Sequence, residues 1–106
     1  MESTKVYEMV TVFPPELDPQ AFDAQVEEVK SIIGNAGGVL LSTDIWGMRE
    51  LCFPVKKKTS GYYSIFYFTG ENFVPHKVRD ILRIKEGIIR YMIMISKNMP
   101  SAVKEA

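Results

Sequence analysis

The distribution of apolar positions divides the chain into six segments, four typical of strands and two typical of helices. The strand-like segments cover residues 6–13, 39–46, 62–69 and 88–95, and the second can continue through Phe53 after a bulge at Gly47. Residues 6–13 and 62–69 are apolar at both odd and even positions, which indicates central strands covered on both faces. Pro54 is tolerated only at an edge or a strand end, so the second strand is predicted to be an edge strand.

Two helices are predicted between these strands. The first begins after Asp18, a residue suited to cap a helix, and ends before three glycines at positions 34, 37 and 38. Its apolar stripe consists of Phe22, Val26, Val29 and Ile33. The second begins near Asn72, keeps Pro75 in its first turn and ends at Gly87. Its apolar stripe consists of Val74, Val78, Ile81 and Leu82. Residues 56–61 are polar and typical of a turn.

The order βαββαβ predicts an α+β fold of the ferredoxin-like class, a split βαβ sandwich. Such a fold has four antiparallel strands with both helices on one face, the first and third strands in the centre and the second and fourth at the edges. One domain is expected over residues 1–97, followed by a short flexible tail over 98–106. The uncovered face of the sheet would carry Val10, Val12, Met92 and Met94, and an exposed apolar face of this kind usually binds a partner.

Composition narrows the class of protein. The chain has 106 residues, one cysteine and no recognisable signal peptide, and no apolar run reaches the ~18 residues that span a bilayer. A single cytosolic domain without a membrane partner is therefore expected. The zero net charge hides a division, because residues 1–48 hold two bases and eight acids (−6) and residues 49–106 hold eleven bases and five acids (+6). A basic half of this kind can attract a polyanion.

The sequence gives little indication of a catalytic site or a metal-binding site. His76 is the only histidine, and no acidic residues surround it at a metal-binding spacing. Cys52 lies between Leu51 and Phe53 and is expected to be a small packed side chain. The glycines follow a helix and so cannot cradle a phosphate in front of one. We expect no enzyme activity, no cofactor, no metal and no small-molecule substrate.

Nucleic-acid binding fits the second half of the chain better. Bases lie on the second and fourth strands, on the segment between the second and third strands and on the second helix, and aromatic residues fill the third strand. The RNA-recognition motif has the same element order, but residues 60–64 (S-G-Y-Y-S) lack the base and the second aromatic of its signature. Contacts to phosphates are therefore expected, and the aromatics of the third strand are expected in the core and at a partner surface.

Residues 44–57, with the sequence D-I-W-G-M-R-E-L-C-F-P-V-K-K, carry the most specific motif. Together with Y-E-M-V at 7–10, G-Y-Y at 61–63 and L-R-I-K-E-G-I-I-R-Y-M-I at 82–93, this segment resembles the family of the sixth protein of the bacterial small ribosomal subunit. The positions that match the family's motif are Trp46, Gly47, Arg49, Leu51, Phe53, Pro54 and Lys57. The resemblance extends over nearly the whole chain and implies the same ferredoxin-like fold.

The resemblance also implies a function. Proteins of that family have no catalytic activity, pair with the eighteenth small-subunit protein and bind the central domain of small-subunit ribosomal RNA. It implies a cytoplasmic, ribosome-associated location and is equally compatible with an organellar ribosome. The implied RNA-binding residues are Lys5, Arg49, Lys57, Arg83 and Arg90, and the implied partner-binding residues are Tyr7, Leu51, Phe53 and Met92. Glu50 departs from the family, which often has Arg or Gln there, and the usual Arg before Tyr7 is missing.

Two alternatives use the same topology. A regulatory or dimerisation module that binds a small ligand is favoured by the near-neutral total charge, which is unusual for a free-standing RNA binder. A hydrolase of the acylphosphatase type would need an arginine in the loop after the first strand, and residues 13–18 contain none.

Overall fold

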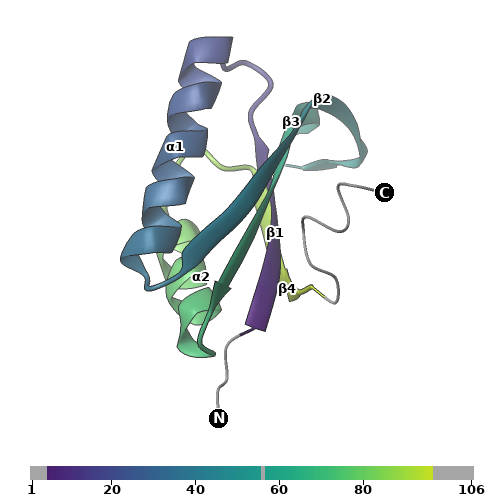
Figure 1. Ribbon diagram of the computed structural model, residues 1–106. Coiled ribbons are helices and arrows are strands. Elements are labelled where there is room, and N and C mark those ends of the chain that lie inside the picture. Colours follow the sequence, from purple (N-terminus) through teal and green to yellow (C-terminus); the bar gives the residue numbers. More distant parts are fainter. Residues whose placement is uncertain (1–4, 56, 97–106) are drawn as a thin grey trace, which may run out of the picture.

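The computed structural model describes residues 5–55 and 57–96, with the side chains of 52, 53 and 55 left out. The elements are β1 (Lys5–Phe13), α1 (Pro19–Asn35), β2 (Val39–Val55), β3 (Lys58–Gly70), α2 (Phe73–Ile84) and β4 (Arg90–Ile95). The predicted order βαββαβ is confirmed (Figure 1). The tail predicted over 98–106 lies outside the described residues.

The four strands form one antiparallel sheet in the order β2-β3-β1-β4. Both helices lie against the same face of it (Figure 1). The ferredoxin-like prediction is thus confirmed, with β1 and β3 in the centre and β2 and β4 at the edges. We call the helix-covered side of the sheet the inner face and the opposite side the outer face.

Helix α1 begins as predicted from its sequence but ends at Asn35, so that Gly34 lies inside the helix and not beyond it. The Asp18 carboxylate accepts a hydrogen bond from the Ala21 backbone N–H (2.7 Å), which satisfies a donor that the first turn would leave unpaired. The predicted stripe of Phe22, Val26, Val29 and Ile33 is buried. Beyond the helix, Gly37 adopts φ +102°, a conformation that glycine takes without a steric penalty.

Helix α2 ends one residue before Lys85, not at Gly87 as predicted from the sequence. Lys85 is extended, and its backbone N–H still bonds the carbonyl oxygens of Ile81 and Leu82. The chain leaves the helix here because Ile88 and Ile89 must both reach buried positions. For the same reason β4 begins at Arg90 and not at residue 88.

The core fills the space between the inner face and the helices. Its largest fully buried side chains on the sheet are Met9, Phe13, Phe66 and Phe68. Thr11 and Ser64 are also fully buried, and they satisfy each other because the Thr11 hydroxyl donates to Ser64 (3.3 Å to its carbonyl oxygen). The packed inner face, together with the Thr11–Ser64 pair, holds β1 and β3 in a fixed register, which also fixes the positions of the outer-face side chains.

The hairpin between β2 and β3 is tighter than the sequence predicts. Residues 56–61 were expected to form a turn, but Lys58 already pairs with Val55 in the sheet. The Lys58 ammonium group also forms an ion pair with the Glu16 carboxylate (2.6 Å). Lys57 occupies the turn with φ +68°, and Lys56 lies outside the described residues. The sheet therefore extends farther toward the tip of this hairpin.

Candidate nucleic-acid interface

Two arginines flank a pair of aromatic rings on the outer face. The rings of Trp46 and Tyr63 stack with their centroids 6.3 Å apart and an angle of 19° between them. The Arg49 guanidinium lies 5.9 Å from the centre of the Trp46 ring, a cation–π contact. Arg90 lies on the other side, since it and Tyr63 are both cross-strand neighbours of Val12. We call Trp46, Arg49, Tyr63 and Arg90 the outer aromatic cluster.

A bulge in β2 brings Trp46 to this position. The register of β2 against β3 shifts between Ile45 and Gly47, so that Trp46 is an extra residue without a partner position. Gly47 makes the shift possible by adopting φ +82°, and a Cβ atom at this position would meet nothing within 4 Å. Glycine is thus favoured here by the positive φ angle and not by a lack of room for a side chain. The Trp46 indole N–H donates to the Asp44 carboxylate (3.2 Å), which fixes the ring.

A shallow hollow of about 210 Å³ lies beside the aromatic pair. Its walls include Tyr63, Arg90 and Met92, and its floor is formed by Val10 and Val12. Val12 was predicted to be an exposed residue of the outer face, but it is only 2% exposed, because Tyr63 and Arg90 flank it in the sheet. Met92 and Met94 are exposed as predicted.

Charge on the outer face is divided between its ends. Within the described residues, Arg49, Lys57 and Arg90 take part in no ion pair, so their charges are available to a ligand. Farther along the same face, Glu8 and Asp44 lie near Tyr67. Burial, followed by the charges of these two carboxylates, raises the pKa of the Tyr67 phenol. A polyanion is therefore attracted to the hairpin end of the face and repelled from the part around Tyr67.

The remaining predicted RNA-binding residues are not gathered in this cluster. Lys5 lies at the first residue of β1, where its ammonium group is 3.5 Å from the Asn72 side-chain oxygen. Arg83 lies in the last turn of α2 and forms an exposed ion pair with Asp80 (2.9 Å). Lys57 lies in the hairpin turn. The structure therefore groups Arg49 with Arg90 and leaves the other three bases at separate positions.

The residues predicted to bind a partner protein also differ in their surroundings. Tyr7 is buried in the core with its ring tilted against that of Phe68 (centroids 5.5 Å apart), so only its hydroxyl end can reach a ligand. Leu51 is half-buried in β2, Met92 is exposed on β4, and the side chain of Phe53 lies outside the described residues. Edge strand β2 also exposes a row of large apolar side chains that the sequence did not single out: Val39, Leu41, Ile45, Trp46 and Met48.

The outer aromatic cluster has the groups that single-stranded nucleic acid requires. Trp46 is 45% exposed and offers a ring on which a base can stack, and the arginines can neutralise phosphates on either side. Arg49 and Arg90 were predicted as RNA-binding residues, but Trp46 and Tyr63 were not. Gly47 was the signal in the sequence from which Trp46 could have been found. A bulge at this glycine changes which side chains of β2 face outward. No cluster of potential metal ligands exists among residues 5–55 and 57–96, and no helix in that part is long and apolar enough to cross a membrane.

Comparison with known proteins gives consistent matches over nearly the whole chain. The family model described as Ribosomal protein S6 matches residues 6–95. The small ribosomal subunit protein bS6 of Clostridium botulinum strain 657 is 41% identical over 88 residues, covering 83% of this chain and 94% of the relative. The protein of the same name from Clostridium kluyveri is 35% identical over 88 residues, covering 83% of this chain and 93% of the relative.

A solved structure shows the same fold. The crystal structure of 30S ribosomal protein S6 from Thermotoga maritima superposes with a TM-score of 0.84 and covers 96% of each chain. The sequence identity of this pair is 22%, so the likeness concerns the arrangement of strands and helices.

Proposed function

The chain belongs to the ribosomal protein S6 family of the small ribosomal subunit, and we propose that it serves there by binding ribosomal RNA through the outer aromatic cluster. Family membership favours the ribosomal hypothesis over the regulatory module. The RNA is proposed to be the central domain of the small-subunit ribosomal RNA, bound together with the eighteenth small-subunit protein. The protein contributes binding energy and geometry and no catalytic step.

The observation that carries this proposal is the position of Arg49 and Arg90 around the stacked rings of Trp46 and Tyr63. Cations that stand on both sides of an exposed ring can hold the backbone of a single strand while one base stacks on the ring. Because these arginines form no ion pair among the described residues, binding RNA need not break one. Their desolvation is the main cost on the protein side.

Edge strand β2 supports the proposal of a protein partner. A long edge strand with exposed apolar residues is a pairing and aggregation hazard unless another chain covers it. Val39, Leu41, Ile45 and Met48 are each at least 40% exposed along this strand. The eighteenth small-subunit protein would bury these side chains together with Leu51 and Phe53. Tyr7 and Met92 are proposed as further contacts at the opposite side of the sheet.

Salt dependence provides the test of the phosphate contacts. We would measure the affinity of the full chain for the RNA fragment, with the partner protein present, over a range of salt concentrations. Removing one cation that touches a phosphate should flatten the slope of log K against log salt by about 0.7–0.9, the counterion-release value for one cation. The double variant R49A/R90A is therefore expected to flatten the slope by about twice that amount.

Lys30→Ala is the matched control, because Lys30 lies on α1, in the layer opposite the outer face, and pairs with Glu27 (3.1 Å). It should leave the slope as in the wild type. Equal slopes for R49A/R90A and the wild type would remove the proposed role of both arginines. Single variants at Lys5, Lys57 and Arg83 test the three separate bases in the same assay, and any of them that touches a phosphate will also flatten the slope.

A further inference from the structure

A second pocket lies at the other end of the sheet, between α2 and edge strand β4. It has a volume of about 410 Å³, within the size range of small-molecule sites. The residues that line it are Lys5, Tyr7, Asn72, Pro75, His76, Arg79, Ile93, Met94 and Ile95. They come from three regions that are distant in sequence, and none of them is acidic. The pocket is separate from the outer aromatic cluster, with which it shares no residue.

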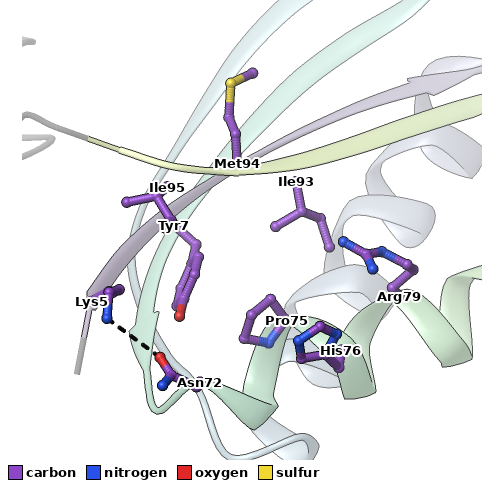
Figure 2. Close-up of a pocket in the computed structure, with 9 residues that line it drawn as sticks. All are labelled: Lys5, Tyr7, Asn72, Pro75, His76, Arg79, Ile93, Met94 and Ile95. Atoms are coloured by element: carbon purple, nitrogen blue, oxygen red, sulfur yellow. Dashed lines mark hydrogen bonds between the residues drawn. The ribbon is translucent and has the colours of Figure 1, made fainter. Parts of the chain in front are cut away.

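Tyr7 is the feature of this pocket that points to a ligand. Its side chain is 4% exposed, and its ring packs against Phe68 in the core. Figure 2 shows its hydroxyl oxygen directed into the space between Asn72 and Pro75. No described residue forms a hydrogen bond with this hydroxyl. A phenylalanine would fill the core equally well, so the hydroxyl is a donor placed at the base of the pocket without a partner in the described part of the protein.

Positive charge lies at both ends of the pocket. Lys5 contributes a cation beside Asn72, Arg79 contributes one at the opposite end, and His76 contributes a ring N–H group between them (Figure 2). The pocket also lies at the first turn of α2, where the helix dipole is positive. Asn72 precedes this helix, but its side chain does not cap it and instead lies 3.5 Å from the Lys5 ammonium group. Its amide group therefore remains available to donate to a ligand.

Apolar side chains complete the wall opposite the cations. Pro75, Ile93 and Ile95 line it, and Figure 2 shows the two isoleucines pointing toward the helix while Met94 points away. A ligand that fits both walls has a charged end rich in oxygen atoms and a flat or apolar end. Lys5, Tyr7 and Asn72 bring donors from three side chains to one end of the pocket, which suits the three terminal oxygens of a phosphate monoester better than the two oxygens of a carboxylate.

We propose that this pocket binds a nucleotide, with its phosphate held by Lys5 and Tyr7 at the Asn72 end and its base against Pro75, Ile93 and Ile95. The site goes beyond the RNA-binding role assigned to the outer aromatic cluster and does not depend on it. The nucleotide can be free in solution or be an unstacked residue of an RNA chain, and the chemistry of recognition is the same for both.

The test is an NMR titration of the ¹⁵N-labelled full chain with adenosine monophosphate, followed through the amide signals of Tyr7, Asn72 and Ile93. Saturable shifts are expected at these positions. Tyr7→Phe should weaken binding about tenfold, the effect of removing a hydrogen bond to a charged group. Lys5→Gln should do the same. Lys77→Gln is the matched control, because Lys77 lies over the Phe73 ring on the helix that lines the pocket but outside the pocket, and should leave the affinity unchanged.

Three further ligands distinguish the outcomes. Adenosine should bind at least tenfold more weakly than the monophosphate, and shifts of equal size with glutamate would overturn the proposal in favour of a carboxylate. Shifts confined to Trp46 and Tyr63, or an affinity unchanged in both Tyr7→Phe and Lys5→Gln, would also overturn it. Displacement of the monophosphate by a single-stranded oligoribonucleotide would identify RNA as the source, and its absence would identify the free nucleotide. Since R49A/R90A leaves the pocket intact, failure here is separable from failure of the RNA-binding proposal.

Discussion

The two faces of the sheet are made from the same four strands but differ in how far their side chains are buried. On the inner face Met9, Phe13, Phe66 and Phe68 are completely buried beneath the helices. On the outer face Trp46, Met92 and Met94 are more than 40% exposed, and the arginines beside them form no ion pair among the described residues. The inner face therefore supplies most of the core, and the outer face leaves apolar and cationic side chains accessible to a ligand.

Truncation of a core ring should produce the largest difference between the faces. Phe66→Ala leaves a cavity at a site without exposure and should lower the free energy of unfolding by about 3–5 kcal/mol. Met92→Ala, on the outer face, should cost about 1 kcal/mol or less. Urea denaturation of both variants measures the difference. Equal losses would mean that the outer face contributes to the core as much as the inner face does.

Removal of the exposed Trp46 ring should instead lower the affinity for RNA and leave stability nearly unchanged. Trp46→Ala should lower the affinity for the RNA by about 1–3 kcal/mol, the range for one stacked base, while stability changes little. Phe73→Ala is a close control, because Phe73 is also an exposed ring with a cation over it, Lys77 at 5.8 Å, but lies on α2. An equal drop in RNA affinity for both variants would show that the stacking role does not belong to the outer face.

The bulge glycine should connect stability to binding. Gly47→Ala must place a side chain at φ +82° and should cost about 1 kcal/mol from backbone strain alone, since no atom lies within 4 Å of the new Cβ. It should also shift the fluorescence of Trp46, the only tryptophan. Gly34→Ala, in α1 with equally open surroundings, should instead stabilise the chain by about 0.5–1 kcal/mol. A neutral Gly47→Ala with unchanged fluorescence would contradict the account of the bulge.

The smallest expected effect concerns Tyr67 and high pH. Burial and the nearby carboxylates of Glu8 and Asp44 raise the pKa of its phenol, so the folded state favours the protonated form. The resulting stability is fully present below the unfolded-state pKa of about 10 and is lost as the pH rises through the folded-state value. Tyr67→Phe should therefore weaken the fall in stability above pH ~10, as measured by urea denaturation over a range of pH. Identical pH profiles for Tyr67→Phe and the wild type would refute this coupling.

The inner face could be predicted from the sequence because it depends on local periodicity. The stripe of α1, the cap at Asp18 and the central positions of β1 and β3 follow from spacing and residue type alone. The ends of elements were harder, since α2 stops at Ile84 to let Ile88 reach the core, a tertiary requirement. The start of β3 at Lys58 likewise follows from its pairing with Val55 across the hairpin, which residue type alone did not indicate.

The sites were only partly predictable. The family resemblance was enough to select Arg49 and Arg90. The aromatic rings beside them could not be selected in this way, because their positions depend on the register of β2 against β3. Trp46 faces Tyr63 only because one residue is inserted before Gly47. The pocket at Tyr7 brings together residues from positions 5–7, 72–79 and 93–95, and no local pattern indicates that these segments meet. From the sequence alone, Tyr7 is indistinguishable from an ordinary core residue, because the direction of its hydroxyl is known only from the structure.

The breaks in the register of β2 have a consequence for the protein before it joins a ribosome. An uninterrupted strand of 17 residues at the edge of a sheet would be a template on which copies of the chain could stack into fibrils. Shifts between Leu40 and Ser42, between Ile45 and Gly47, and between Glu50 and Val55 divide this edge into short stretches with altered twist. The same irregularity that brings Trp46 to the outer face thus makes this edge a poorer template for pairing between copies of the chain.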